Sequence, residues 1–522
     1  MRFFHPAGPL RLILLALSGC LGSCKAPAPE PVRPNIIYIL ADDLGYGELG
    51  AYGQSLIETP NLDALAAGGM TFTQHYAGAP VCAPSRYMLL TGKHSGHAFI
   101  RGNDEWAARG PVWDYRAMAA DSTLEGQRPL PPSEKLLPQW LQEEGYRTGM
   151  FGKWGLGAPQ TVSVPNLKGF DEFYGYNCQR QAHTYYPLHL YHNRHRVALA
   201  NDTVAPHTGF EALDGMEDFG YFQQDDYAPD RIFAALTHFV ASGSDQPFFL
   251  YWATPIPHAP LQAPERWVNY YREKFGEEPP YDASEGGYFP QEYPRATYAA
   301  MISYLDENIG KLVALLQEKG LAENTLILFS SDNGPSYAGG AQPEWFGSAN
   351  PFPSAYGRGK GFVYEGGIRV PLLAHWPGQI APGSQSDHIS AQYDLLPTLA
   401  ELVGFATPEG VDGISFLPTL LGHKGQQQHP ALVWAFPEYR GQLAVRAGPW
   451  KLVERGLNDS LLNPGPELYH LERDPQEQEN LASRYPALVD SLATVFQKAY
   501  QVPETPRFRL REWEAVNAIP DL

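Results

Sequence analysis

The residues best suited to chemistry stand directly after short apolar runs. Asp42 and Asp43 follow the run IIYIL, and Asp332 and Asn333 follow the run LILF. Carboxylate and amide oxygens are hard ligands that suit Ca²⁺ or Mg²⁺, whereas Zn²⁺ prefers imidazole or thiolate. Because Asp and Asn are also common in turns, either pair alone fits a structural role. Two such pairs in equivalent positions predict a metal site.

Three further side chains are able to bind an anion or move a proton. Lys153 follows the run at 146–151, and Lys360 lies between glycines in GRGKG, where the backbone can approach a ligand closely. His258 follows the run FFLYW within the segment PIPHAP, whose prolines restrict the backbone. A single lysine or histidine of this kind is more often a surface or loop residue, so these three carry weight only together with the oxygen ligands.

Cys82 lies in the segment VCAPSRYMLLTGK, next to Pro84 and Arg86. Proline in the first turn opens a helix without losing a hydrogen bond, and the N–H groups at that end favour an anion. Arg86 adds a planar cationic donor. Most free cysteines are small buried apolar residues, but these neighbours argue for chemistry at Cys82. Apart from Cys20 and Cys24 in a targeting segment, the only other cysteine is Cys178, so at most one disulfide and no thiolate metal cluster is expected.

Helical patterns separate the apolar runs. Residues 60–68 begin with proline and end with glycine, and residues 294–319 carry apolar side chains at helical spacing before Gly320. This alternation predicts an α/β fold with a large, mostly parallel sheet sandwiched by helices. Ligands bind beyond the carboxyl ends of the strands in such sheets. We therefore expect the runs that end in Asp-Asp, Asp-Asn, His and Lys to meet at one edge.

The pattern of apolar runs and turns changes after about residue 430. Short strand-like runs at 432–434, 443–446 and 450–453 are separated by turns, and a helical stretch follows near 485–499. This pattern predicts a smaller antiparallel α+β subdomain that closes the chain. We expect a catalytic domain over residues 35–428 and this subdomain over residues 429–522.

The first 24 residues have the form of an export signal. Arg2 and Arg11 precede or flank a short apolar core that is too short to span a bilayer as a helix. The segment LSGC ending at Cys20 fits a bacterial lipobox, and LGSC ending at Cys24 is a weaker match; an ordinary cleaved signal is the alternative. Residues 25–34 form a proline-rich tether. The sequence thus predicts an exported lipoprotein of the periplasm or cell surface, attached to the membrane only by its lipid.

The charge balance argues against a surface that binds nucleic acid or coats another polyanion. With 57 acidic and 38 basic residues, the net charge of −19 implies neither a nucleic-acid surface nor a surface that coats polyanions. An anionic substrate therefore needs a local positive pocket built from few residues. Abundant Gly (51) and Pro (48), with 13% aromatic residues, favour long, ordered, aromatic-lined loops.

The motifs together resemble those of the formylglycine-dependent sulfatases, a family of the alkaline phosphatase superfamily. CAPSRYMLLTG fits the pattern Cys-x-Pro-Ser-Arg followed by Leu-Thr-Gly. The other landmarks appear in the family's order: PNIIYILADDLGYGELGAYG, TPNLDALAAGG, GYRTGMFGKWGLG, the PHAP turn, FSSDNGP and GKGFVYEGGIRVP. ELYHLERDPQEQENLA resembles the family's closing segment, so the likeness covers nearly the whole mature chain. It implies an alkaline phosphatase-like fold.

The resemblance implies that Cys82 is oxidised to formylglycine by a formylglycine-generating enzyme or an anaerobic sulfatase-maturating enzyme. One hydroxyl of the hydrated aldehyde attacks the sulfur of a sulfate ester, and deprotonation of the second hydroxyl then expels sulfate. The family also implies Ca²⁺, in preference to Mg²⁺. Its expected ligands are Asp42, Asp43, Asp332, Asn333 and the modified Cys82.

The same resemblance gives roles to the cationic residues. Arg86 is expected to hold the nucleophile and the metal-site geometry. Lys153 and Lys360 are expected to bind sulfate oxygens, and His258 to protonate the leaving alkoxide. One position departs from the family: many members have histidine after Gly-Lys-Trp, where this chain has Gly155. That histidine assists the second hydroxyl, so the base that drives sulfate release is left open.

The expected substrate is a sulfated carbohydrate, because an exported lipoprotein with aromatic loops suits glycan degradation. Arg101 and Asn103 in HSGHAFIRGN, and His183 in CQRQAHTYYP, are the predicted sugar contacts, with a structural role as the alternative for each. His183 is also a candidate for the missing base. Two other functions stay open: a phosphodiesterase or phosphonate hydrolase of the same superfamily, and a non-catalytic binder of sulfated glycans.

Overall fold

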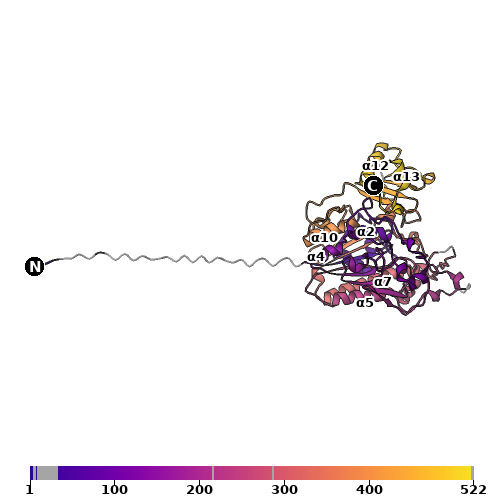
Figure 1. Ribbon diagram of the computed structural model, residues 1–522, viewed down its shortest axis with the longest axis horizontal. Coiled ribbons are helices and arrows are strands. Elements are labelled where there is room, and N and C mark those ends of the chain that lie inside the picture. Colours follow the sequence, from indigo (N-terminus) through magenta and orange to yellow (C-terminus); the bar gives the residue numbers. More distant parts are fainter. Residues whose placement is uncertain (4–7, 9–32, 214–216, 285–286, 519–522) are drawn as a thin grey trace. The chain divides into compact units, whose positions relative to one another are not determined.

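The computed structural model describes residues 1–3, 8, 33–213, 217–284 and 287–518. From Arg33 onward the chain forms one compact unit (Figure 1). The predicted signal, lipobox and tether lie almost entirely outside the described residues and stay predictions. Within the described part of the chain, no helix is long and apolar enough to cross a membrane.

A ten-stranded mixed sheet forms the centre of this unit. Its five neighbouring strands β9, β1, β8, β4 and β5 are parallel, whereas β10, β6 and β7 pair antiparallel with their neighbours. This confirms the predicted large, mostly parallel sheet. The strand order is β11 (Ser384–Ser386), β2 (Met70–Phe72), β10 (Leu372–His375), β9 (Thr325–Ser331), β1 (Asn35–Ala41), β8 (Phe248–Ala253), β4 (Arg147–Lys153), β5 (Glu172–Tyr176), β6 (His189–His192) and β7 (His195–Ala198).

Helices cover both faces of the sheet. Along β1, Ile37 and Ile39 pack into one hydrophobic cluster while Ile36 and Tyr38 pack into another, as the two-residue period of a strand requires. Figure 1 shows α5 and α7 on one side and α2, α4 and α10 on the other. The first layer contains α1 (Pro60–Ala67), α5 (Ala228–Ala241), α6 (Glu265–Phe275) and α7 (Pro294–Glu318); the second contains α2 (Cys82–Thr91), α4 (Leu137–Glu143) and α10 (Leu395–Val403).

A separate four-stranded antiparallel sheet follows near the C-terminus, as predicted. It consists of β13 (Leu432–Phe436), β14 (Gln442–Ala447), β15 (Trp450–Arg455) and β16 (Glu467–His470). Leu452 and Leu468 of this sheet pack with Leu492 and Phe496 of α12 (Pro486–Ala499). The helices α12 and α13 (Arg511–Val516) are yellow in Figure 1. The domain boundary at 428/429 stays a prediction.

The remaining strands and α-helices among the described residues are short. They are β3 (His75–Tyr76), β12 (Ser390–Ala391), α3 (Tyr115–Ala120), α8 (Pro343–Phe346), α9 (Glu365–Ile368) and α11 (Leu417–Leu420).

Candidate active site

Four neighbouring parallel strands deliver the polar residues to one edge of the sheet. These strands are neighbours in the order β9, β1, β8 and β4. Asp332-Asn333 follow β9, Asp42-Asp43 follow β1, His258 follows β8, and Lys153 is the last residue of β4. Ala41 pairs with Ser331 in the register of β1 and β9, and the N–H of Asp332 donates to the carbonyl of Ala41 at 3.0 Å. The four runs therefore meet at one edge, as the sequence predicts.

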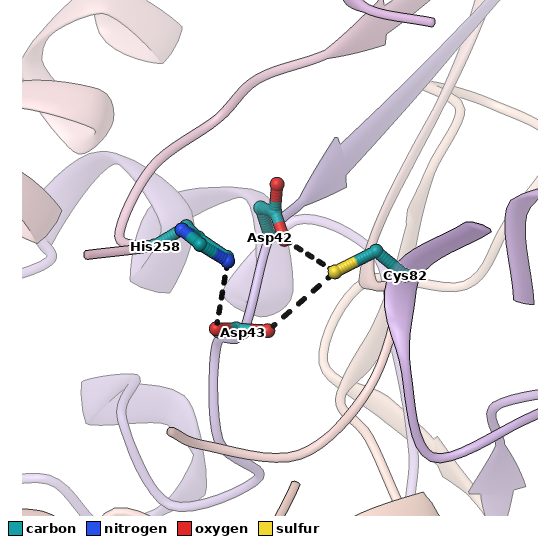
Figure 2. Close-up of side chains that lie close together, drawn as sticks. All are labelled: Asp42, Asp43, Cys82 and His258. Carbon is teal, nitrogen blue, oxygen red and sulfur yellow. Dashed lines mark hydrogen bonds and ion pairs between the residues drawn. The ribbon is translucent and has the colours of Figure 1, made fainter. Parts of the chain in front are cut away.

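Cys82 is the first residue of α2 and lies directly above this edge. Its side chain is 1% exposed, and Sγ lies 3.2 Å from Oδ1 of Asp42 and 3.9 Å from Oδ1 of Asp43. Figure 2 shows the sulfur pointing between the two carboxylates, with His258 on the other side of Asp43. Ser85, one turn into the helix, donates to the carbonyl of Asp332 at 2.5 Å. The helix start is thereby fastened to the end of β9.

Arg86 crosslinks the strand ends from within the protein. Its guanidinium is 1% exposed and contacts both Asp332 (2.9 Å) and Asp42 (3.2 Å). Another of its nitrogens donates to the carbonyl of Lys153 at 2.7 Å. A planar guanidinium with several fixed donors suits this role better than an ammonium group. Arg86 therefore holds three strand ends at fixed distances.

The two lysines pair with different carboxylates of the site. Lys153 Nζ lies 2.6 Å from Asp42, and Lys360 Nζ lies 2.7 Å from Asp43. His258 Nδ1 donates to the carbonyl of Ala259 at 2.5 Å, which leaves Nε2 facing Asp43 at 3.7 Å. The site thus holds two primary ammonium groups and one imidazole nitrogen around the Cys82 side chain.

Burial and neighbouring charges shift the protonation of these groups. Burial and the charge of Asp42 raise the pKa of the Cys82 thiol well above its ordinary value, so the unmodified side chain is no thiolate nucleophile. Burial opposes ionisation of Asp42, but Lys153 and Arg86 outweigh it and hold the pKa well below the usual range. Burial and Lys360 lower the pKa of His258 to about 4. An anion bound beside His258 will favour its protonated form.

The donor set fits a hard divalent cation. Nδ2 of Asn333 donates to Asp43 (2.8 Å) and to the carbonyl of Gly334 (2.9 Å), so Oδ1 is the amide atom left for a ligand. That buried oxygen has no hydrogen-bond partner among the described residues. Burial and the charge of Asp42 raise the pKa of Asp332, a repulsion that a cation would relieve. Asp43 adopts a left-handed backbone (φ 67°), as strained residues at functional sites often do.

A buried glutamine, Gln179, lies beside Gly155, the position at which the sequence departs from the motif. A Cβ on Gly155 (φ 74°) would lie 3.2 Å from Oε1 of Gln179, and this oxygen has no hydrogen-bond partner in the described chain. Nε2 of Gln179 donates to Oδ1 of Asn103 at 3.2 Å, which also accepts from the N–H of Ala83 at 3.4 Å. An amide can orient a hydroxyl but cannot take its proton. No local pattern distinguishes Gln179 in the sequence.

The three predicted sugar contacts have different surroundings. Asn103 lies beside the start of α2, and His183 stacks on His258 at 5.0 Å between ring centroids. Arg101 is 2% exposed and donates to the carbonyls of Ala98 (2.9 Å) and Gly96 (2.8 Å). Its guanidinium also lies over the ring of Tyr500. Arg101 therefore ties its own loop to the C-terminal subdomain, which is the structural alternative to the predicted sugar contact.

Cys178, the other cysteine within the described residues, is not among the residues that contact Cys82. Cys82 and Cys178 are both free and buried, so the disulfide that the count allowed is not formed. Cys178 packs in a small cluster with Met118 and Tyr115. Its role is that of an ordinary buried apolar residue.

Comparisons with known proteins point to one family. The family model described as Sulfatase matches residues 34–405, and the model described as N-sulphoglucosamine sulphohydrolase, C-terminal, matches residues 358–500. N-acetylgalactosamine-6-sulfatase of Homo sapiens is 30% identical, with 96% of this chain and 92% of that protein covered. Arylsulfatase A of Homo sapiens is 32% identical over 91% of this chain and 87% of its own length. The crystal structure of Ps i-CgsB in complex with k-i-k-neocarrahexaose superposes with a TM-score of 0.71 at 27% identity, covering 94% and 98% of the two chains.

Proposed function

Because this chain belongs to the sulfatase family and is therefore a sulfuric ester hydrolase, we propose that it removes O-sulfate groups from the sugars of a sulfated glycan. The observation that carries the proposal is the position of Cys82, buried at a helix start beside two carboxylates that each pair with a lysine. The glycan substrate is supported by the relative named for N-acetylgalactosamine 6-sulfate and by the neighbour that binds a neocarrahexaose.

The nucleophile in this proposal is a formylglycine made from Cys82 by a maturation enzyme. Its hydrate supplies one hydroxyl to attack the sulfur and a second whose deprotonation releases sulfate, which neither a thiol nor a serine can do. The raised pKa of the unmodified thiol agrees with a precursor role. Oδ1 of Asp42 lies 3.2 Å from Sγ of Cys82 and would orient the hydrated aldehyde that replaces the thiol.

Two lysines and a histidine would handle the ester. Lys153 and Lys360 lie where ammonium groups can bind sulfate oxygens and stabilise the charge that builds on them in the transition state. His258 presents Nε2 toward the same space because its Nδ1 is occupied by a carbonyl. Protonated once an anion is bound, it donates that proton to the leaving alkoxide.

We also propose that Asp42, Asp43, Asp332 and Asn333 hold Ca²⁺ together with the modified Cys82. The support is the set of oxygen donors and the unpaired Oδ1 of Asn333. Bound there, the ion would neutralise negative charge on the nucleophile and on a sulfate oxygen. Arg86 keeps the ligands in place through Asp42 and Asp332.

Export as a lipid-anchored protein is part of the same proposal. It is supported by the signal-like segment and by the lipobox at Cys20, with Cys24 as a second possible site. A protein outside the cytoplasmic membrane meets polymeric sulfated glycans directly. Labelling with a fatty acid that is lost in the Cys20→Ala variant but kept in Cys24→Ala would identify the anchored cysteine.

The test compares three reactions of the matured enzyme: release of sulfate from a panel of sulfated mono- and disaccharides, hydrolysis of the matching phosphodiester, and hydrolysis of a phosphonate monoester. We expect the sulfate ester to be the preferred substrate. A faster phosphodiester or phosphonate reaction would favour the other enzyme class of the superfamily. Binding of sulfated sugars without any turnover would favour the non-catalytic binder. The Cys82→Ala variant, purified in parallel, excludes a contaminating sulfatase.

A further inference from the structure

Three aromatic side chains form a wall beside His258, here called the histidine wall: His183, His207 and Tyr288. The ring of His183 is nearly parallel to that of His258, with 5.0 Å between centroids and 12° between planes. Tyr288 meets both rings edge-on, 5.4 Å from His183 and 5.7 Å from His258. His207 lies 4.8 Å from Tyr288. A sugar whose leaving oxygen reaches His258 therefore lies beside this wall.

A chain of hydrogen bonds sets where the protons of the wall reside. His207 Nδ1 lies 2.6 Å from the carbonyl oxygen of Gly287, which can only accept, so Nδ1 carries the proton. The other nitrogen of His207, Nε2, is then an acceptor and lies 3.4 Å from Nδ1 of His183. Nδ1 of His183 must therefore donate, which leaves a lone pair on its Nε2.

The surroundings keep both rings uncharged. Burial lowers the pKa of His183 well below its ordinary value, and the nearby His258 and Lys153 lower it further. Burial also lowers the pKa of His207. Within residues 33–213, 217–284 and 287–518, His207 is the only hydrogen-bond partner of the His183 side chain. Nε2 of His183 is thus an open, neutral acceptor beside the catalytic histidine.

A neutral acceptor at this point suits one chemical feature of the substrate. A sugar hydroxyl can donate to an imidazole nitrogen, whereas a sulfate group offers only acceptor oxygens. A carboxylate in the same place would also accept from the hydroxyl, but it would repel the anionic ester nearby. An uncharged imidazole accepts the hydrogen bond without that repulsion.

We propose that His183, with its proton position set by His207, accepts a hydrogen bond from a free hydroxyl next to the sulfate ester on the same sugar ring. The proposal rests on the sulfatase function proposed above and narrows its substrate class to sugars that are unsubstituted beside the ester. A second sulfate at that position places acceptor oxygens against an acceptor nitrogen, so such sugars are poor substrates. His183 is a binding residue here, and His207 is a positioning residue.

The experiment uses two aryl esters that differ only beside the ester, 2-hydroxyphenyl sulfate and 2-methoxyphenyl sulfate. The measured quantity is the ratio of their kcat/KM values on one preparation of matured enzyme, which cancels differences in the folded fraction. For the unaltered enzyme we expect a preference of about 10-fold or more for the hydroxyl ester, the effect of one hydrogen bond to a desolvated acceptor. His183→Ala and His207→Ala should both lower this ratio of kcat/KM values to about 1. The control is His195→Ala, an exposed histidine on β7, which should keep the original ratio.

Each outcome is decisive. An unaltered enzyme with no preference between the two esters overturns the proposal without any variant. A ratio that changes in His183→Ala but not in His207→Ala overturns the positioning role of His207. If neither these esters nor any sulfated mono- or disaccharide of the panel above releases sulfate while Cys82 is fully converted, the sulfatase function itself fails, which separates that failure from failure of the hydroxyl contact.

Discussion

Two groups of buried charges in this protein differ in how completely they are paired. The site around Cys82 is one; the other, here called the Glu365 cluster, joins the catalytic part to the C-terminal sheet through Glu365, Lys451 and Glu477. Lys451 is fully buried and lies 2.9 Å from each of the two glutamates. The second oxygen of Glu365 accepts from Tyr76 (2.7 Å) and Arg369 (3.0 Å), and that of Glu477 accepts from the N–H of Glu365 (2.8 Å).

The buried polar groups of the Cys82 site are not all paired in this way. The buried oxygens of Asn333 and Gln179 have no hydrogen-bond partner among the described residues. Three buried carboxylates also face one another there, and the pKa of Asp332 is raised by burial and by Asp42. Leaving buried polar groups unpaired costs stability, so a protein retains such an arrangement where a ligand completes it. The comparison separates a cluster that holds the fold from one that the proposed metal and substrate would complete.

The largest expected effect is at the nucleophile. In protein matured by a formylglycine-generating enzyme that acts on cysteine, Cys82→Ser and Cys82→Ala should both abolish multiple turnover, because alanine gives no aldehyde and an unoxidised serine would be left as a stable sulfate ester. The fold should survive, since Sγ accounts for only weak contacts at 3.2 and 3.9 Å. Steady-state sulfate release and circular dichroism measure the two effects. Sustained turnover by the serine variant at a rate near that of the parent would contradict the mechanism.

The next largest effect is expected at Lys360. Lys360→Ala should lower kcat/KM by about 100-fold or more, as loss of a charge-stabilising donor does in other active sites. Because Lys360→Ala also leaves the buried Asp43 without its partner at 2.7 Å, the free energy of unfolding is measured alongside and kcat/KM is compared per folded molecule. Lys311→Ala, which removes an exposed lysine that is 51% accessible, is the control for activity. Equal kcat/KM values for Lys360→Ala and the parent would exclude Lys360 from the site.

The Glu365 cluster should show the reverse pattern. Lys451→Met leaves two buried carboxylates without their ammonium partner and should cost about 3–5 kcal/mol of stability. Activity per folded molecule should stay near the parent value, because Lys451 touches no residue of the Cys82 site. The exposed Lys311→Met should change the free energy of unfolding by less than about 0.5 kcal/mol. Denaturant unfolding measures both; an active-site defect in well-folded Lys451→Met protein would contradict the division into two clusters.

The smallest expected change in stability concerns the metal. Adding Ca²⁺ to chelated protein should restore activity and raise Tm. The free energy of unfolding should rise by about 2.7 kcal/mol when the free ion is at 100 times its Kd. Asp332→Asn replaces a charged ligand by a neutral one and removes one of three repelling charges, so it should weaken the Ca²⁺ response while the chelated protein unfolds near the parent Tm. Full activity after exhaustive chelation, with no metal found by elemental analysis, would refute the Ca²⁺ site.

Local sequence signals predict one half of the site well. A buried strand that ends in Asp-Asp, Asp-Asn or Lys carries its own signature, and the four strands proved to be neighbours in the sheet. The start of α2 at Cys82 follows from Pro84 in the same way. These features depend on a few consecutive residues, so the sequence contains enough information to place them.

The other half depends on loops that are distant in the chain. Gln179 faces Gly155 and binds Asn103 only because three separate segments meet there, and His207 reaches His183 from a loop with no periodic pattern. Arg101 lies in a loop that reaches the site, but its own environment was set by Tyr500 of the C-terminal subdomain. Such contacts are decided by tertiary packing, which no short stretch of sequence encodes.

The most direct test of the account is the chemical state of residue 82 measured together with sulfate release. The protein would be produced with and without a formylglycine-generating enzyme, and mass spectrometry of the peptide containing residues 82–86 would give the converted fraction. We predict formylglycine at position 82 and a rate of sulfate-ester hydrolysis that rises in proportion to that fraction across preparations. Full turnover by protein in which Cys82 remains an unmodified cysteine would contradict the central claim.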